Sequence, residues 1–324
     1  MSNALADRVE PKCSPSIGIL LASYNGERFF AQQLNSILAQ SYEHWTLYIS
    51  DDGSNDATLT IARDFAELHP GKIILISGPS LGFVENFLYL VDKTLGKFDF
   101  YCFCDQDDIW LPKKCEQAIL QSSKSDQNLP FLYCGATELI DERGCTLMPA
   151  DKKQLHPCFK NALVQNIASG NTMMFNNAGA VLIGSLEPAL RSVIPAHDWW
   201  AYQILTAAGG VVHFDPVPYV RYRQHSQNII GSGHGMKAYL LKISRTLTGT
   251  RAAWYRNNVR ALNATRHFLT PDSNQTLRHF GQTNAHSFVK RLVALYRSGV
   301  RRQRWPGTLG LFLFAAFNKL LKPA

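Results

Sequence analysis

The sequence predicts an α/β protein with a mainly parallel central sheet and helices on both of its faces. Short apolar runs rich in branched and aromatic residues indicate buried strands, and helical patterns lie between them. Polar clusters follow directly after several of these runs, at the strand ends where such sheets bind ligands. The chain has 324 residues, of which 46% are apolar, so it can bury a sizeable core.

The N-terminal part supplies the alternation of strands and helices. We expect strands at residues 16–23, 45–50, 72–77, 98–104 and 129–135. A helical pattern with apolar residues between positions 30 and 38 follows the first strand. A second helix at 57–68, capped by Ser54 or Asp56, follows the next strand, and a third at 83–94 follows the strand after that. Apolar strands that alternate with helices indicate a parallel sheet covered on both faces.

Two acidic clusters follow the second and fourth strands. Asp51 and Asp52 open the first cluster, and Asp105, Asp107 and Asp108 form the second. A turn that leads into a helix is the simple alternative for each, since Asp, Gly and Ser favour turns. Neither cluster has Lys or Arg beside it, however, and like charges this close repel unless a cation lies among them. A hard cation such as Mg²⁺ or Mn²⁺, with a phosphate ligand, would relieve the repulsion.

No glycine-rich loop is available to bind that phosphate. The sequence has no G-x-x-x-x-G-K-[ST] motif, which excludes the P-loop nucleotide-binding proteins. No G-x-G-x-x-G follows the first strand, which argues against a dinucleotide-binding fold. A diphosphate held by a metal without such a loop indicates a nucleotide sugar.

Ordered blocks between residues 16 and 235 resemble the glycosyltransferase family two, which has the GT-A fold. The blocks are ILLASYNGERFFAQQLNSILAQSY, LYISDDGSNDAT, FCDQDDIWLPKK, SGNTMMFN, AHDWWAY and YRQHSQNIIG. Within that family the chain is most similar to bacterial rhamnosyltransferases that build cell-surface polysaccharide. The resemblance implies a metal-dependent, inverting transferase with L-rhamnose from dTDP-L-rhamnose as the donor. A UDP-linked donor is the alternative within the same fold.

The resemblance also implies roles for individual residues. The residues expected to line the nucleotide pocket are Ala22, Tyr24, Asn25, Asp51, Asp52, Asn86, Asp105 and Gln106. Asp107 is expected to bind the metal, and His225 is a further metal or diphosphate ligand, with a hydrogen-bonded loop histidine as its alternative. Asp108 is expected to support the cluster. The residues expected to contact the acceptor are Asn171, Thr172, Trp199 and Trp200.

Asp198 is the candidate general base. An inverting transfer is a single displacement, so a group must accept the proton of the acceptor hydroxyl. Asp198 stands between His197 and two tryptophans, where partial desolvation should raise its pKa, and the family places its base here. The alternative is that Asp198 caps a helix at 199–208. Both roles are compatible.

The charge of the chain is divided unequally. Residues 1–235 hold 17 Lys and Arg against 24 Asp and Glu, whereas residues 236–324 hold 16 against the single acid Asp272. We therefore expect a catalytic domain at 16–235, a glycine-rich linker at 231–235 and a basic helical extension at 236–324. The apolar run at 309–317 is too short to span a bilayer but suits an anionic membrane surface. A helix packed on the catalytic domain, with its charged face in solvent, is the alternative.

Partners and location follow from these features. The N-terminal segment has no apolar signal region, and the 7 cysteines have no zinc-site spacing, so we expect a cytoplasmic protein attached to the inner face of the cell membrane. The expected partners are a nucleotide sugar and a saccharide acceptor carried on a lipid. A nucleic-acid-binding protein and a nucleotide-sugar-binding subunit without catalysis are the alternatives from other classes. The acidic clusters argue against the first, and the presence of Asp107 and Asp198 argues against the second.

Overall fold

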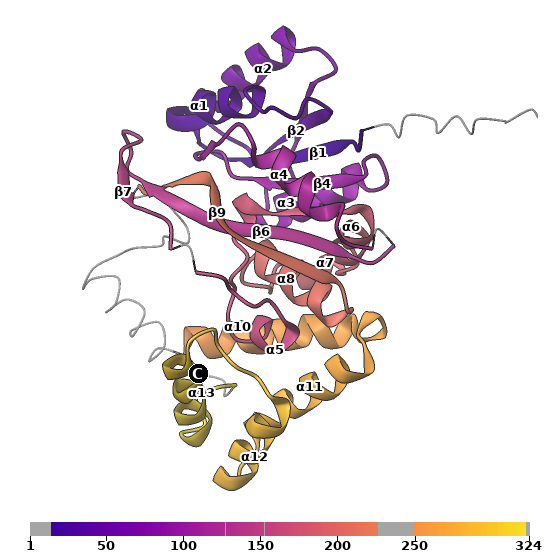
Figure 1. Cartoon of the computed structure of the whole chain (residues 1–324), viewed down its shortest axis with the longest axis vertical. Helices are drawn as coiled ribbons and strands as arrows, with labels where there is room; N and C mark the ends of the chain where they lie inside the picture. Colours follow the sequence, from indigo (N-terminus) through magenta and orange to yellow (C-terminus); the bar gives the residue numbers. More distant parts are fainter. Residues whose placement is uncertain (1–13, 127, 152, 226–248, 322–324) are drawn as a thin grey trace, which may run out of the picture.

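A nine-stranded sheet forms the centre of the molecule in the computed structural model, which describes residues 14–126, 128–151, 153–225 and 249–321 (Figure 1). The strand order is β3-β2-β1-β4-β8-β6-β9-β5, and β7 pairs with β6 beside this path. The strands are β1 Ile17–Ser23, β2 Trp45–Asp51, β3 Ile73–Ser77, β4 Phe100–Cys104, β5 Ile109–Trp110, β6 Phe131–Ile140, β7 Thr146–Met148, β8 Met174–Asn176 and β9 Val211–Arg223.

The strands β3, β2, β1 and β4 run parallel to one another. Beyond β4 the sheet changes direction, because β8 pairs antiparallel with both β4 and β6, and β9 pairs parallel with β6. The predicted α/β class with a mainly parallel sheet is therefore confirmed. The antiparallel strands β5, β7 and β8 were not expected from the sequence.

Helices cover both faces of the sheet and continue below it. Before residue 226 the helices are α1 Glu27–Leu38, α2 Thr58–Leu68, α3 Phe83–Thr94, α4 Lys114–Ser122, α5 Phe159–Ala162, α6 Asn177–Gly184, α7 Pro188–Arg191 and α8 His197–Ala207, with a single 3₁₀ turn, η1, at Gly170–Thr172. After residue 248 they are α10 Thr250–Ala264, α11 Pro271–Gly281, α12 Phe288–Ser298 and α13 Trp305–Ala316, with 3₁₀ turns η2 Arg266–Phe268 and η3 Gln282–Asn284.

Strand β1 shows why an unbroken apolar run forms the middle of this sheet. Successive side chains of a strand point to opposite faces, so both faces of β1 must be apolar if helices cover both. Ile19 and Leu21 join a buried cluster with Phe30 and Leu34 of α1. Leu20, between them in sequence, joins the cluster on the other face, with helix α3. The carboxyl end of β1 is thereby fixed between two layers of helices.

The predicted helices differ from the structure mainly at their starts. Helix α3 has the predicted bounds, whereas α2 begins at Thr58. Asp56 accepts hydrogen bonds from the Thr58 N–H and hydroxyl, while the Ser54 hydroxyl donates to Asp51 instead. Of the two proposed caps, Asp56 is thus the one that contacts the helix start.

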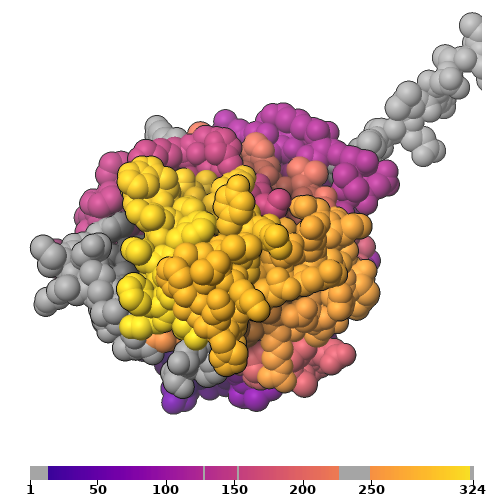
Figure 2. Space-filling view, turned by 90° about the horizontal axis from the view of Figure 1, so that it is seen from below, coloured from indigo at the N-terminus to yellow at the C-terminus, as the bar shows by residue number. Residues whose placement is uncertain are grey.

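The C-terminal helices pack on the rest of the protein. Tyr255, Leu262, Phe280 and Leu311 lie in the same buried cluster as Leu20 of β1. Figure 2, seen from below, shows these helices covering the lower end of the molecule. The predicted linker at 231–235 and the start of the predicted extension lie outside the described residues.

Helix α13 is docked by its neighbour α12. The buried guanidinium of Arg291 donates to the carbonyls of Ala315 and Ala316 at the end of α13, and to those of Ala285 and His286 before α12. Among the described residues, no helix is long and apolar enough to cross a membrane. The six cysteines in the described ranges are free thiols.

Candidate active site at the ends of the parallel strands

The register of the sheet brings the polar clusters to one edge. Ser23 at the end of β1 lies opposite Asp51 at the end of β2, and Leu21 lies opposite Cys104 at the end of β4. The segments that follow β1, β2 and β4 therefore leave the sheet side by side. Parallel sheets bind ligands outside these carboxyl ends.

The first acidic cluster is held by hydrogen bonds from the protein itself. Asp51 accepts from the N–H groups of Gly53 and Ser54 through Oδ1, and from the hydroxyls of Ser23 and Ser54 through Oδ2. Asp52 accepts from the N–H groups of Ser80 and Gly82 and so fixes the loop before α3. Both carboxylates are buried. A direct contact of either with a nucleotide base stays a prediction.

Gln106 ties the loop after β1 to the acidic loop after β4. Its Oε1 accepts from the Tyr24 N–H and its Nε2 donates to the Tyr24 carbonyl, at 2.9 and 3.0 Å. A Cβ at Gly26 would lie 2.4 Å from Gln106 Oε1, so only glycine leaves room for this contact. Asn25 adopts the left-handed conformation that Asn tolerates, with φ of 48°. The Tyr24 ring is 56% exposed and remains free to contact a ligand.

Asn86 and Ala22 both lie next to Ser50, near the end of β2. Asn86 is 1% exposed, donates through Nδ2 to the Ser50 carbonyl, and accepts from the Ser50 hydroxyl. Ala22 lies opposite Ser50 in the sheet. The amide of Asn86 is thus buried and paired within the protein, and its contact with the nucleotide stays a prediction.

Asp108 is the structural member of the second acidic cluster. Its buried carboxylate accepts from Asn171 Nδ2 at 2.5 Å and from the Arg223 N–H at 3.0 Å. Burial, together with the charges of Asp107 and Asp105, holds the pKa of Asp108 well above its ordinary value. Asp108 therefore joins the acidic loop to the turn η1 and to the end of β9.

Asp107 and Asp105 form the polar face of this loop. His225 Nε2 lies 2.7 Å from Asp107 Oδ2, so the histidine from YRQH reaches the carboxylate expected to bind a metal. Burial first, and then the charges of Asp107 and Asp198, raise the pKa of Asp105 to about 8. Asp105 is thus more readily protonated than an exposed aspartate.

Arg223 is a buried residue of this site that the sequence did not predict. Its guanidinium donates to the Asp107 carbonyl, to the carbonyls of Asp141 and Glu142, and to Gln32 Oε1. It also lies 4.5 Å from the centre of the Phe29 ring. Four segments of the chain meet at this one side chain, which holds the acidic loop against the end of β9.

Asp198 lies in the first turn of α8, whose N-cap is Ala196. Its carboxylate accepts from the N–H groups of Gly170 and Trp199, at 3.2 and 2.6 Å, and from the side chain of Asn166. Burial outweighs these hydrogen bonds and raises the pKa of Asp198 to about 6. The carboxylate is therefore a stronger base than an exposed aspartate.

The turn η1 places Asn171 and Thr172 between Asp108 and Asp198. Asn171 Oδ1 has no hydrogen-bond partner in the described structure, while its Nδ2 holds Asp108. The Thr172 hydroxyl donates to the Ser169 carbonyl and accepts from the Gly135 N–H. Both side chains are buried. Their contact with an acceptor stays a prediction.

The expected contact of the two tryptophan rings with the acceptor is corrected. Trp199 and Trp200 are 8% and 0% exposed, and both belong to the apolar core. The Trp199 indole N–H donates to the Ala162 carbonyl, and that of Trp200 donates to the Ile183 carbonyl. Neither ring offers a face to an acceptor, and both instead fix α8 in place.

The acidic loop fits a divalent cation that shares its coordination with a phosphate ligand. No group of three or more His, Cys, Asp and Glu side chains gathers into a metal cage within the described ranges. Asp107 and His225 nevertheless supply an adjacent carboxylate and imidazole. The carboxyl group of Asp105, whose pKa is raised by burial and by the charge of Asp107, lies in the same loop. Mg²⁺ commonly takes one or two carboxylates and completes its coordination with phosphate oxygens and water. The residues present meet that requirement.

Comparison with known proteins gives the family context. Residues 19–133 match the model of the family described as "Glycosyl transferase family 2". The chain is 29% identical over 265 residues to "dTDP-rhamnosyl transferase RfbG" of Shigella flexneri, a match that covers 74% of this chain and 82% of that protein. It is 30% identical over 126 residues to the Escherichia coli "UDP-Glc:alpha-D-GlcNAc-diphosphoundecaprenol beta-1,3-glucosyltransferase WfgD", over 39% of this chain and 47% of WfgD.

Two solved structures resemble the whole described fold. TarS 1–349 of S. aureus superposes with a TM-score of 0.58 at 14% identity, covering 94% of this chain and 88% of TarS. The mannosyltransferase PcManGT of Pyrobaculum calidifontis, solved with GDP-Man and Mn²⁺, superposes with a TM-score of 0.52 at 14% identity and covers 94% and 89%. These likenesses extend over the sheet and the C-terminal helices alike.

The family match covers the strands β1 to β4, whose carboxyl ends carry both acidic clusters. The solved neighbours share the architecture in which those ends meet. The chain is therefore similar to glycosyl transferase family 2 over residues 19–133, and it shares the fold of these solved transferases.

Proposed function

We propose that this glycosyltransferase moves L-rhamnose from dTDP-L-rhamnose to a saccharide acceptor, with inversion at the anomeric carbon, in the synthesis of a surface polysaccharide. One observation carries the proposal: Asp105 lies close enough to both Asp107 and Asp198 for their charges to raise its pKa, so the candidate base and the candidate metal ligand Asp107 share one site. Similarity to RfbG supports the donor. A UDP-linked sugar is the second candidate donor, because the chain also resembles WfgD.

Asp107 and His225 would hold the divalent cation of the donor complex. The chemistry that a bound Mg²⁺ or Mn²⁺ supplies is positive charge beside the departing diphosphate. Arg223, through the Asp107 carbonyl, and Gln106, through Tyr24, keep the loops on either side of this position in place. The exposed Tyr24 ring is suited to lie against the nucleotide base.

The transfer itself needs one base and one leaving group. As the acceptor oxygen bonds to the anomeric carbon, the Asp198 carboxylate accepts the hydroxyl proton. The bond between the anomeric carbon and the diphosphate oxygen breaks, and its electron pair leaves with the nucleoside diphosphate. A pKa near 6 keeps Asp198 mostly ionised at neutral pH while making it basic enough to help. Hydrogen bonds from Gly170 and Trp199 orient the carboxylate.

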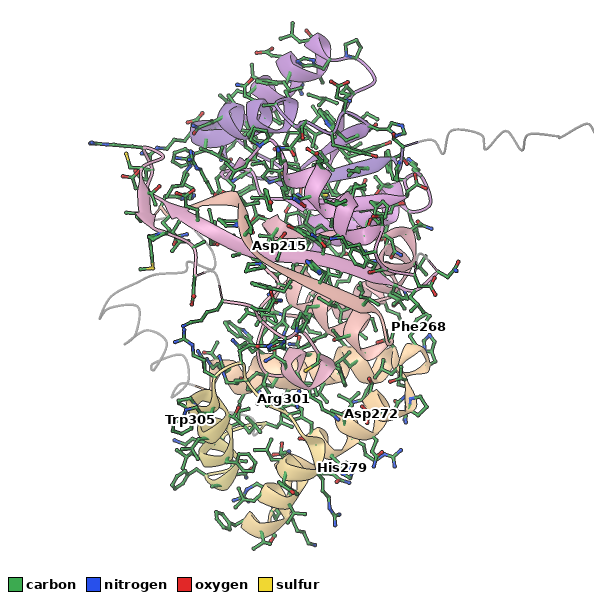
Figure 3. All side chains as sticks on the ribbon, viewed as in Figure 1. Asp215, Phe268, Asp272, His279, Arg301 and Trp305 are labelled. Atoms are coloured by element: carbon green, nitrogen blue, oxygen red, sulfur yellow. The ribbon has the colours of Figure 1, made fainter. Side chains whose placement is uncertain are left out.

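The C-terminal helices present an apolar surface suited to a membrane. Trp305, Leu309, Leu313 and Phe317 recur every four residues along α13, and all four are exposed. Helix α13 carries no charged residue. The alternative of a packed helix with a charged face in solvent therefore does not describe this helix. Leu311 and Ala315, on its other side, are buried against the rest of the protein. Figure 3 labels Trp305 and Arg301 near its start.

Basic residues border this surface, including Arg297, Arg301 and Arg304, and all three are exposed. A basic and apolar surface of this kind favours attachment to an anionic membrane, at the inner face of the cell membrane for a cytoplasmic enzyme. An acceptor carried on a lipid would then be presented beside the enzyme.

We expect Asp107→Ala to abolish metal-dependent binding of dTDP-L-rhamnose, because it removes the carboxylate at the acidic loop. Isothermal titration of dTDP-L-rhamnose with and without MnCl₂ measures this effect. The exposed acid Asp64 of α2 provides a matched control, since Asp64→Ala removes the same charge far from the strand ends. Binding by the Asp107 variant that still responds to Mn²⁺ as the wild type does would show that the metal lies elsewhere.

We expect Asp198→Asn to lower kcat by roughly 10²–10⁴-fold, the usual contribution of a general base, with little change in donor affinity. In the wild type, kcat should fall below pH 6, where the carboxylate becomes protonated. Because burial raises this pKa above its unfolded value, the ionised Asp198 costs stability as pH rises between about 4 and 6. Asn removes that cost, so the variant should unfold at higher urea than the wild type at pH 7. A loss of stability together with donor affinity would identify a structural residue instead.

We expect the wild type to bind anionic vesicles at low salt. The double variant Leu309→Glu, Leu313→Glu should lose this binding. Both side chains are more than half exposed, at 53% and 55%, so the fold should tolerate the change. Vesicle co-sedimentation measures binding, and Leu68→Glu on α2, where Leu68 is 74% exposed, is the matched control. Wild-type protein that stays in the supernatant at low salt would contradict membrane attachment.

A further inference from the structure

A cavity of about 280 Å³ lies between α10 and α13. Its apolar part is formed by Leu311, Phe314 and Leu320. Arg251, Arg302 and Lys319 also line it, and the described lining includes no acidic side chain. A hollow that combines hydrocarbon walls with three cations suits a ligand that is apolar at one end and anionic at the other.

The polar end of the cavity is fixed by contacts to the Val164 carbonyl. Tyr255 donates its hydroxyl to this carbonyl at 3.2 Å, and Arg302 Nη1 donates to the same carbonyl at 3.3 Å. A Cβ at Gly307 would lie 2.8 Å from Arg302 Cδ, so the glycine lets the arginine stem lie against the backbone of α13. The guanidinium is therefore held in place before any ligand arrives, which suits it to bind phosphate.

Gly310 opens the apolar end of the cavity. A Cβ at this position would meet no atom within 4 Å, although the residue lies in the middle of α13 and lines the hollow. Glycine disfavours a helix interior relative to alanine, so the chain keeps this space at some expense of helix stability. The lining of the cavity at Gly310 is therefore unobstructed, which leaves room for hydrocarbon beside the helix.

A second, more polar cavity of about 710 Å³ adjoins the first and shares Arg302 and Gly307 with it. The amide side chains of Gln154, Gln165 and Gln303 line it together with the charged side chains of Asp151, Lys153 and Arg304. The amides hydrogen-bond protein groups, and amides can both donate to and accept from hydroxyl groups. Gln165 precedes Asn166, whose side chain hydrogen-bonds Asp198. The polar cavity is thus linked by neighbouring residues to the candidate base.

We propose that the cavity between α10 and α13 binds the phosphate and the first part of the hydrocarbon chain of an amphiphilic phosphate ester, with Arg302 and Lys319 at the phosphate and Gly310 beside the chain. The adjoining amide-lined cavity receives the polar group that the phosphate carries. Identification of this amphiphile as the acceptor rests on the proposed transfer to a lipid-carried saccharide. Binding to the cavity itself requires neither donor nor metal.

Binding of dodecyl phosphate below its micelle concentration tests the site, measured by isothermal titration on the full-length protein without donor or metal. Arg302→Gln and Lys319→Gln should each weaken binding by at least tenfold. Gly310→Phe fills the open space and should do the same, whereas Gly310→Ala should bind as the wild type does. Arg278 of α11 is exposed and outside the cavity, so Arg278→Gln is the matched charge control. Circular dichroism verifies the fold of each variant. If Arg302→Gln misfolds, Lys319→Gln still tests the site, because Lys319 is exposed and its replacement should not disturb the fold.

Pyrophosphate and dodecyl maltoside separate the two halves of the ligand. We expect pyrophosphate to bind at least tenfold more weakly than dodecyl phosphate and to be insensitive to Gly310→Phe, and we expect no binding of the uncharged maltoside. Pyrophosphate that binds as tightly as dodecyl phosphate would overturn the amphiphile in favour of a free anion. Dodecyl phosphate that binds the Gly310→Phe and Lys319→Gln variants as tightly as the wild type would overturn the site. Neither result affects the proposed transfer reaction, which the Asp198 and Asp107 variants test.

Discussion

The gathering of carboxylates at one edge of the sheet is the constraint on which the rest of the structure depends. Asp105, Asp107 and Asp108 follow one strand, and Asp198 approaches them from α8 closely enough to raise the pKa of Asp105. Folding brings these charges together although they repel, and burial increases the cost. The protein therefore needs hydrogen-bond donors around the cluster, and a cation bound there would lower the repulsion.

The supporting contacts divide the carboxylates into two groups. Asn171 and the Arg223 N–H satisfy Asp108, so this residue braces the loop and is removed from ligand chemistry. Asp107, beside His225, is left facing the strand-end site. Arg223 makes this division possible, because it is fully buried and joins the acidic loop to the turn after β6 and to α1.

The sequence predicted the parts of the site that lie directly after apolar strands. Parallel register forces the ends of β1, β2 and β4 together, so their polar clusters were expected at one edge, and they are found there. Strand β9 was missed because Pro216 and Pro218 interrupt its pattern, and prolines argue against a strand inside a sheet. The tryptophans after Asp198 were assigned to the acceptor because sequence alone does not tell which face of α8 meets the core. Arg223 was missed because a buried arginine that bonds backbone carbonyls has no sequence pattern.

The most direct test of the account is the stereochemistry of donor cleavage. Proton NMR can follow dTDP-β-L-rhamnose during slow hydrolysis by the full-length protein with Mn²⁺. If Asp198 activates an incoming hydroxyl opposite the diphosphate, water attacks the same face and the first sugar released has the inverted, α configuration. Release of the β anomer first, or Mn²⁺-independent cleavage, would contradict a single displacement at a metal-bound diphosphate.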